Sequence, residues 1–330
     1  MRTALIFNPA SGISTMSTTV GTPQEHEQLV LAELGKYGIE PQVYYTTPED
    51  MGTGQAQQAA KEGYELVIAC GGDGTVHAVA NGLIGTQSTL GIIAAGTMNN
   101  LAHSLSLPDT IEGACKAIAK GITRTIDIGV INDHPFLEVA GIGLEAALFP
   151  SAEEIKSPGW LSTIQGVATG LWTLFSFKPV TLRISIDGRK RRSEHAIELT
   201  VCNSPYYGAH FQIAPGTLMD DGWLDVVIYK NFSKLEYLRH AFAISRGQRP
   251  FERKMVHRRV KSMRVEASRP VEVQVDGAAF GYTPATIRVL PGALRVRVAS
   301  ENAPGLSKEH EQHTSGENEQ SEDSGVQVSM

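Results

Sequence analysis

The chain has 330 residues, 42% of them apolar and 19% charged, so it can form one large or two moderate globular domains and is not disordered as a whole. The formal net charge of -6 falls within residues 301–330, which hold seven acidic residues and one lysine. Residues 1–300 are therefore neutral, which excludes a general polyanion binder, and we expect no nucleic-acid partner. Residues 301–330 have no aromatic side chain and are expected to be a disordered acidic tail.

The cysteines and the N-terminus indicate a cytoplasmic protein. Cys70, Cys115 and Cys202 have neither metal-site spacing nor the framework of a disulfide-rich fold, so buried reduced thiols are expected. Met1 runs directly into Arg2-Thr-Ala-Leu-Ile-Phe7, without the layout of a signal peptide.

The first part of the chain alternates short apolar runs with helical segments. Strands are expected at 4–7, 42–45, 66–70 and 90–95, with helices from Pro23 to about Gly38, up to Gly63, over 76–84 and from Asp109 to Gly121. Thr22-Pro23-Gln24-Glu25 supplies an N-cap, a proline at the first helical position and a capping-box glutamate. This alternation predicts an α/β domain over residues 1–125 with a mostly parallel sheet.

The pattern changes to period-2 strands after about Thr125. Apolar residues alternate at 182–186, 271–275, 287–289 and 294–298, with turns at Asp187-Gly188 and Pro291-Gly292. We therefore expect an antiparallel β domain over residues 126–300. Residues 157–177 carry no charge, but their polar residues and the helical spacing of Trp160, Ile164 and Leu171 favour a half-buried or surface-lying helix over a membrane span.

The strongest local motif is Cys70-Gly-Gly-Asp-Gly-Thr75, which follows an apolar strand and opens a helix. Glycines at such a turn let a phosphate approach backbone N–H groups at the positive end of the helix. The alternative is a tight turn without a ligand. Three glycines around Asp73, at the carboxyl end of a parallel strand, favour the phosphate site.

Two further loops occupy the same position in the pattern. Asn8-Pro-Ala-Ser-Gly12 follows the first strand, and Gly96-Thr-Met-Asn-Asn100 lies between a strand and a helix. Because the carboxyl ends of parallel strands meet at one edge of a sheet, the three loops together predict a nucleotide crevice. The chain has no Gly-x4-Gly-Lys-Ser/Thr motif and no Gly-x-Gly-x-x-Gly after its first strand, which argues against P-loop enzymes and dinucleotide oxidoreductases.

These motifs resemble those of the diacylglycerol kinase catalytic family, and more narrowly its bacterial lipid kinases, which are related to sphingosine kinases. The resemblance covers essentially residues 1–300 and rests on Asn8–Gly12, Gly71–Leu83, Gly96–Ala102, Ile213–Asp225, Val275–Gly277 and Leu290–Val296. NAD kinases and phosphofructokinases share Gly-Gly-Asp-Gly-Thr, so the later motifs make the match specific. The resemblance implies an NAD-kinase-like α/β domain, a β-sandwich domain that holds the lipid, and ATP between them.

The resemblance also implies a set of site residues. Nucleotide contacts are expected at Asn8, Thr46 or Thr47, Gly71, Gly72, Asp73, Gly74, Thr75, Gly96, Thr97 and Asn99. A structural Mg²⁺ is expected at the Asp221 carboxylate and the backbone carbonyls of Leu218 and Trp223. Without the resemblance, Asp220-Asp221-Gly222 would be interpreted as an ordinary turn. The implied activity is transfer of the γ-phosphoryl group of ATP to a hydroxyl of diacylglycerol or a related lipid.

Three positions depart from the family pattern. Asp276-Gly277-Ala278 stands where the family has Asp-Gly-Glu, His77-Ala78 where it has Asn-Glu, and Ile13 where it often has a basic residue. Because alanine cannot accept a proton, the catalytic base is expected to be Asp276 or another carboxylate. Strand alternation would place residues 276 and 278 on the same face. The scattered histidines, including His77, are expected to be surface or capping residues.

The departures leave two other functions open. The chain could be a non-catalytic nucleotide- or lipid-binding protein on this fold, or a soluble-substrate kinase related to NAD kinases. Under the lipid-kinase interpretation the partners are a lipid substrate and a membrane that the protein contacts peripherally, and a homodimer stays open. A basic run, Arg249, Arg253, Lys254, Arg258, Arg259, Lys261 and Arg264, is either a solvated hairpin face or a site for anionic headgroups.

Overall fold

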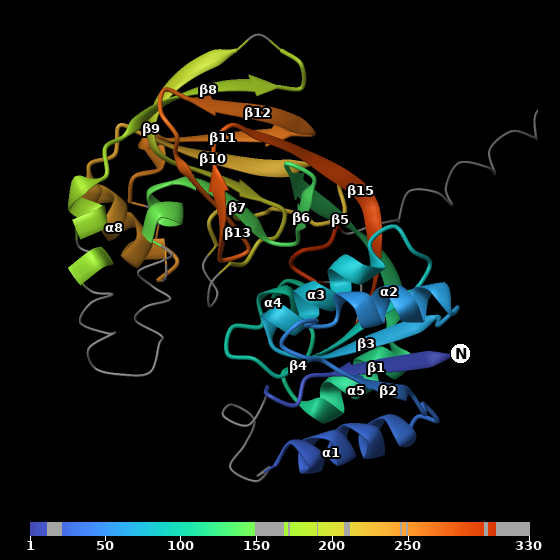
Figure 1. The fold of residues 1–330 in the computed structure, drawn as a ribbon. Coiled ribbons are helices and arrows are strands. Elements are labelled where there is room, and N and C mark those ends of the chain that lie inside the picture. Colours follow the sequence, from blue (N-terminus) through green and yellow to red (C-terminus); the bar gives the residue numbers. More distant parts are fainter. Residues whose placement is uncertain are drawn as a thin grey trace, which may run out of the picture.

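A computed structural model of the chain describes residues 1–11, 22–148, 168–170, 172–189, 191–207, 212–244, 246–248, 250–299 and 303–307. Within these ranges the chain forms an N-terminal α/β body and a C-terminal body of mainly antiparallel strands, joined by two long strands (Figure 1). The fold class predicted from the sequence is confirmed.

The N-terminal body is built on four parallel strands in the order β2–β1–β3–β4. Their bounds, β1 (Thr3–Phe7), β2 (Gln42–Tyr45), β3 (Leu66–Gly71) and β4 (Thr89–Ala94), agree closely with the predicted ones. Helices α2 (Thr53–Lys61) and α3 (Asp73–Leu83) cover one face, and α1 (Pro23–Gly35) and α5 (Ile111–Lys120) cover the other (Figure 1). In β1, Ala4 and Ile6 pack toward the first helix pair, whereas Leu5 and Phe7 pack toward the second.

Local chemistry sets where these helices begin. Thr22 caps α1 through the N–H of Glu25, and the Glu25 carboxylate accepts from the N–H of Thr22, so the predicted capping box is present. Helix α3 begins at Asp73, three residues before its predicted start, because Gly72 is its N-cap. The first residues of the phosphate motif are therefore the first turn of a helix.

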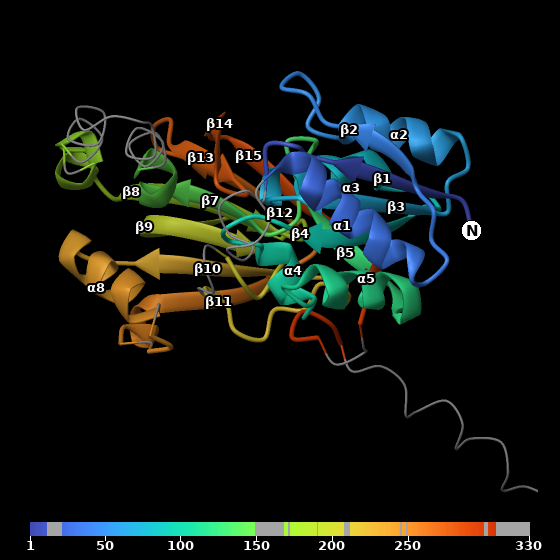
Figure 2. The same cartoon turned by 90° about the horizontal axis from the view of Figure 1, so that it is seen from below.

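The C-terminal body is a set of mainly antiparallel strands with two buried apolar clusters. The long strand β9 (Arg192–Cys202) pairs with β7 (Val139–Gly143), β8 (Val180–Ile186) and β10 (Leu224–Lys230). The remaining strands are β6 (His134–Phe136), β11 (Met255–Val260), β12 (Ser262–Ala267), β13 (Glu272–Val275) and β14 (Ala278–Tyr282). Helix α8 (Lys234–Ile244) and the 3-10 turn η1 (Glu252–Lys254) complete this body, and α8 lies at the end away from the N-terminal body (Figure 2).

Two strands, β5 (Ile122–Ile131) and β15 (Ala285–Val298), join the bodies. The first half of β15 pairs with β12, and its second half pairs with β4 of the N-terminal sheet. The prediction of a hairpin turn at Pro291-Gly292 is wrong. Both halves of β15 pair with β5 in the same direction, so the chain does not reverse there and forms a bulge between Leu290 and Leu294. The Gly292 N–H, 2.7 Å from an Asp127 carboxylate oxygen, fixes that bulge.

The composition suggested that the whole segment 301–330 is disordered. The structure instead shows residues 303–307 packed against the folded body. Ala303 and Leu306 are buried in the core of the N-terminal body. The backbone of Gly305 bonds to Ser104 and Met219, and Ser307 donates to the Asp220 carboxylate from both its N–H and its hydroxyl. Two buried side chains and the hydrogen bonds of Gly305 and Ser307 dock this segment, a local feature that composition over 30 residues does not show. Residues 308–330 lie outside the described part of the chain.

Most of the predicted helix over 157–177 also lies outside the described residues. Residues 168–170 and 172–176 are helical, with Leu174 and Phe177 buried and Trp172 and Phe175 exposed. In the part of the chain that the structure describes, no helix is long and apolar enough to cross a membrane.

Candidate active site at the junction of the two bodies

The three glycine-bearing loops meet at the carboxyl edge of the N-terminal sheet. The Asn8 side-chain amide donates to the Thr75 hydroxyl at 2.8 Å, and the Asn8 N–H donates to the Cys70 carbonyl at 2.9 Å. The Ala95 N–H donates to the Gly71 carbonyl at 2.8 Å. Thr46, whose N–H donates to the Phe7 carbonyl, lies at the same edge. The structure thus brings the predicted nucleotide-contact residues together, and Gly12, the last residue of the first loop, lies outside the described residues.

Two of the glycines are required by close packing of one loop on the other. A Cβ on Gly96 would lie 2.7 Å from the Gly72 Cα, and one on Gly72 would lie 3.3 Å from the Gly96 Cα. Gly74 differs, because a Cβ there would meet nothing within 4 Å. Gly74 and Thr97 are the predicted nucleotide-contact residues of these two loops that are exposed.

Asp73 holds the second loop in place. Its two carboxylate oxygens accept from the N–H groups of Asn99 and Asn100 at 2.9 and 2.8 Å. The Asn99 side chain closes the turn by bonding both the N–H and the carbonyl of Gly96, while its backbone is left-handed at φ 51°. Asp73 is thus a structural residue of the crevice as well as a predicted nucleotide contact.

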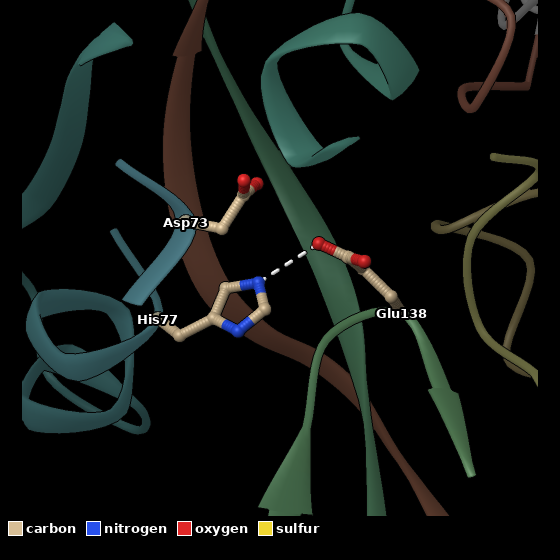
Figure 3. A group of neighbouring side chains, drawn as sticks. All are labelled: Asp73, His77 and Glu138. Atoms are coloured by element: carbon tan, nitrogen blue, oxygen red, sulfur yellow. Dashed lines mark hydrogen bonds and ion pairs between the residues drawn. The ribbon is translucent and has the colours of Figure 1, made fainter. Parts of the chain in front are cut away.

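His77 and Glu138 lie beside Asp73 of this crevice, and one ligand atom from each of the three residues lies within 4.8 Å of the others (Figure 3). His77 lies one helical turn after Asp73 on α3, and its Nε2 is 2.8 Å from Oε1 of Glu138, which directly precedes β7. The other ring nitrogen, Nδ1, is 3.8 Å from Oδ2 of Asp276. The second Glu138 oxygen accepts from the Asn100 side-chain amide at 2.9 Å. The prediction that His77 is a surface or capping residue is wrong, because its side chain is only 15% exposed.

These neighbours shift the protonation of the pair. Burial alone would lower the pKa of His77, but the hydrogen bond to Glu138 and the charges of Asp276, Glu138 and Asp73 together raise that pKa to about 9. Burial raises the pKa of Glu138 to about 7, against the opposing effect of the His77 hydrogen bond. His77 is therefore an imidazolium at neutral pH, and the Glu138 carboxyl titrates near neutral pH. The three described loops contain no lysine or arginine, so His77 supplies the cation nearest to them in sequence.

Asp276 lies in a turn and not on a strand. Val275 pairs directly with Ala278, and Asp276 and Gly277 form the two-residue connection with φ of 45° and 82°. Strand alternation therefore does not relate 276 to 278, and Ala278 is exposed. The Asp276 carboxylate accepts from the N–H groups of Leu137, Glu138 and Val139 at 2.8–2.9 Å. It fixes the backbone that carries Glu138, and its predicted role as the base stays a prediction.

The residues predicted to hold Mg²⁺ lie elsewhere, before β10. Asp221 pairs with the Arg259 guanidinium, and its Oδ1 accepts from the Trp223 N–H at 3.0 Å. Asp220 pairs with Arg124 at 2.7 Å. Burial, and then the charges of Asp221 and Asp220, raise the pKa of the neighbouring Asp127 even though it accepts from the N–H groups of Gly292 and Gly222. Asp220 and Asp221 are thus each paired with an arginine, and Mg²⁺ binding by Asp221 with the carbonyls of Leu218 and Trp223 stays a prediction.

Comparison with known proteins agrees with this geometry. Residues 2–131 match the family model of the diacylglycerol kinase catalytic domain, and residues 139–298 match that of the YegS C-terminal NAD kinase beta sandwich-like domain. The chain belongs to the diacylglycerol kinase catalytic family. It is 29% identical to a diacylglycerol kinase of Bacillus subtilis (strain 168), over 92% of this chain and 99% of that protein.

Solved structures support the same family and fold. The crystal structure of a putative diacylglycerol kinase from Bacillus anthracis str. Sterne is 27% identical in sequence to this chain, with a TM-score of 0.71. The match covers 90% of this chain and 97% of that one. An NAD kinase from Archaeoglobus fulgidus, solved in complex with ATP, is 12% identical with a TM-score of 0.50, and it shows the shared fold alone. Family membership supports a phosphotransferase for this chain.

Sequence reasoning missed Glu138 and the pairing of His77. The signal was present, because Glu138 is a single charge inside the apolar run Phe136–Ile142. A charge within a buried strand sequence needs a partner. The sequence does not say that the partner is His77, 61 residues away.

Proposed function

We propose that the protein is an ATP-dependent lipid kinase that transfers the γ-phosphoryl group to a hydroxyl of diacylglycerol or a related lipid. The observation that carries the proposal is the junction itself. Three loops that offer backbone N–H groups meet beside a buried imidazolium and two carboxylates, at the boundary of the two bodies, in a chain of the diacylglycerol kinase family. Phosphoryl transfer requires mainly positioning and neutralisation of charge, and the backbone N–H groups of the three loops are suited to both.

ATP is proposed to bind along the three loops. The N-terminus of α3 and the exposed backbone at Gly74 and Thr97 would accept its phosphates. The imidazolium of His77 lies one turn further along the same helix, where its positive charge would favour a phosphoryl group at the helix start. The proposed contacts of Asn8 and Asn99 are supported by their place in the loops and by the resemblance of their motifs.

The hydroxyl proton needs an acceptor when the oxygen attacks phosphorus and the bond from phosphorus to the bridging oxygen of ADP breaks. Asp276 is the acceptor suggested by the sequence. Glu138 is the second candidate, and it lies within the same cluster with a pKa near neutrality, which suits a general base. The absence of a carboxylate at 278 therefore does not leave the site without one.

Mg²⁺ is proposed to bind the Asp221 carboxylate with the carbonyls of Leu218 and Trp223. When bound, it would neutralise excess negative charge among the aspartates before β10. In the structure the guanidinium of Arg259 forms an ion pair with Asp221, so Mg²⁺ would compete with that arginine for the carboxylate. This site lies in the C-terminal body, and its proposed role is structural.

A non-catalytic binding protein is the second candidate, and it is favoured by Ala278 standing where the family has glutamate. The deciding experiment incubates the purified full chain with γ-labelled ATP and Mg²⁺, separately with extracted lipids and with NAD. Label in a lipid supports the proposal, and label in NAD indicates a soluble-substrate kinase. If ATP binds but no acceptor is labelled, the protein is a binding module.

A further inference from the structure

Two helical segments at the outer end of the C-terminal body expose large apolar side chains. They are residues 172–176 and α8, which both lie at the end of the C-terminal body that points away from the N-terminal body (Figure 2). The exposed fractions are 75% for Trp172, 71% for Phe175, 67% for Leu235, 42% for Leu238 and 61% for Phe242. We call these five side chains the apolar end face.

Packing against the core does not account for the apolar end face. The opposite sides of the two segments already fill the local core with Leu174 and Phe177 and, on α8, with His240 against Tyr229. Trp172 and Phe175 are three residues apart, and Leu235, Leu238 and Phe242 are spaced by three and four, so each set lies along one outward stripe. A helix that is apolar on its solvent side as well as its core side indicates a second apolar partner.

The two stripes form one surface. The ammonium group of Lys234, at the start of α8, donates to the backbone carbonyl of Phe175. This bond holds the end of one segment against the beginning of the other. Phe175 therefore lies beside the start of α8, the helix that carries Leu235, Leu238 and Phe242.

The charges around the apolar end face are mainly positive. Lys178, Lys234, Arg239 and Arg246 lie on or directly after these segments, and the Arg246 guanidinium lies 4.2 Å from the centroid of the Phe242 ring. Glu236, the acidic residue of α8, is paired with Lys254 at 2.8 Å. Apolar side chains bordered by lysine and arginine complement a bilayer surface, in which anionic headgroups lie above acyl chains.

We propose that the apolar end face is the site at which the protein docks on an anionic lipid bilayer, with Trp172, Phe175 and Phe242 entering the headgroup boundary. Tryptophan favours that boundary because its ring is apolar and its N–H is polar. The lysine and arginine stems can lie along the inserted rings while their charges reach the headgroups. This inference deepens the proposed function, on which the choice of a lipid partner partly rests.

The experiment measures co-sedimentation of the full chain with vesicles, in the absence of ATP. We expect binding to phosphatidylcholine vesicles that contain phosphatidylglycerol, weaker binding to phosphatidylcholine alone, and a decrease with added salt. The double variants Trp172→Ser/Phe175→Ser and Leu235→Ser/Phe242→Ser should each reduce the partition coefficient by about tenfold or more, since each removes two large apolar side chains from the contact. Lys178→Gln/Arg246→Gln should remove most of the preference for the anionic vesicles.

Matched controls keep the result specific. Met51→Ser and Tyr282→Ser also change exposed apolar residues, 41% and 62% exposed, and should bind as the wild type does. Arg258→Gln/Lys261→Gln tests the basic run as the alternative contact. The proposal is overturned if the end-face variants bind like the wild type, if only the basic-run variant loses binding, or if sedimentation velocity shows a dimer that the end-face substitutions dissociate.

The readout separates this inference from the kinase proposal. Vesicle binding without any phosphoryl transfer would refute the kinase and leave the docking surface standing. Conversely, a kinase active on a dispersed short-chain diacylglycerol, with vesicle binding unchanged in the end-face variants, would refute only the docking surface.

Discussion

Nε2 of His77 lies 2.8 Å from Oε1 of Glu138, and this ion pair connects α3, which follows the second glycine-bearing loop along the chain, to the residue directly before β7 of the C-terminal body. The Asn100 amide and the Asp276 carboxylate complete the contact from two other segments. The candidate site is thus the place where the two bodies are joined by charge. The residues that would carry out the chemistry of the site, His77, Glu138 and Asp276, also link the two bodies.

The first prediction concerns the pH dependence that His77 confers. Its pKa is raised from 6.5 to about 9 in the folded protein, so the folded state keeps a proton that the unfolded state loses. The stability contributed by the His77 proton is fully present below about pH 6.5 and is lost as the pH rises through about 9. In His77→Asn this fall should be absent, as measured by urea unfolding at several pH values across that window. His103→Asn is the control and should keep the wild-type profile.

The second prediction distinguishes the two candidate bases. If Glu138 accepts the proton, Glu138→Gln should lower kcat by about 10²–10⁴-fold with little change in the Kd for ATP. If Asp276 does so, Asp276→Asn should show that loss and Glu138→Gln a smaller one. Asp276→Asn should also lower the melting temperature, because it removes a charged acceptor of three N–H groups. Glu33→Gln, a buried carboxylate on α1, is the control. Wild-type kcat in both site variants would exclude general-base catalysis by either residue.

Restoring a carboxylate at 278 gives a third test. Ala278 is exposed, so Ala278→Glu should fold normally. We expect turnover to rise several-fold if the site is weakened by the missing glutamate, since an added general base contributes to rate. Ala278→Gln is the matched control for size. Unchanged turnover in an active enzyme would indicate that the Glu138 and Asp276 cluster already serves the proton transfer.

The fourth prediction is that Asp73 matters for stability as well as activity. Asp73→Ala would leave the N–H groups of Asn99 and Asn100 without their acceptor. We expect a loss of about 1–3 kcal/mol in the free energy of unfolding, together with loss of ATP binding. Denaturant unfolding and ATP titration measure the two effects separately. An Asp73→Ala protein with wild-type stability would show that the two N–H groups find other partners.

The fifth prediction compares two truncations. Removal of residues 301–330 deletes Leu306, which is 3% exposed, and the Ser307 bonds to Asp220. We expect it to lower the free energy of unfolding by about 2–4 kcal/mol. Removal of residues 309–330 leaves those contacts in place and should preserve the melting temperature. Equal melting temperatures for both truncations would show that the docked segment contributes nothing.

The sequence by itself determined the α/β and β organisation, the parallel strands and the three glycine-bearing loops. These follow from interactions between residues close in the chain: apolar periodicity, the capping box at Thr22 and Glu25, and glycines at strand-to-helix turns. The carboxyl ends of parallel strands must share an edge, so the meeting of Asn8, Thr75 and Ala95 could also be foreseen. The family motifs lie in these local segments, which is why the resemblance could be found.

Only the tertiary structure decided which distant side chains became partners. His77 and Glu138 are 61 residues apart, and Asp276 is 138 residues from the Glu138 N–H that it fixes. The same applies to β15, which continues past Pro291-Gly292 because β5 pairs with both its halves. It also applies to Leu306, which packs into the core of the N-terminal body. Burial and charge act through space. A lone glutamate in an apolar run therefore indicates that a partner is needed, but only the fold determines which residue that partner is.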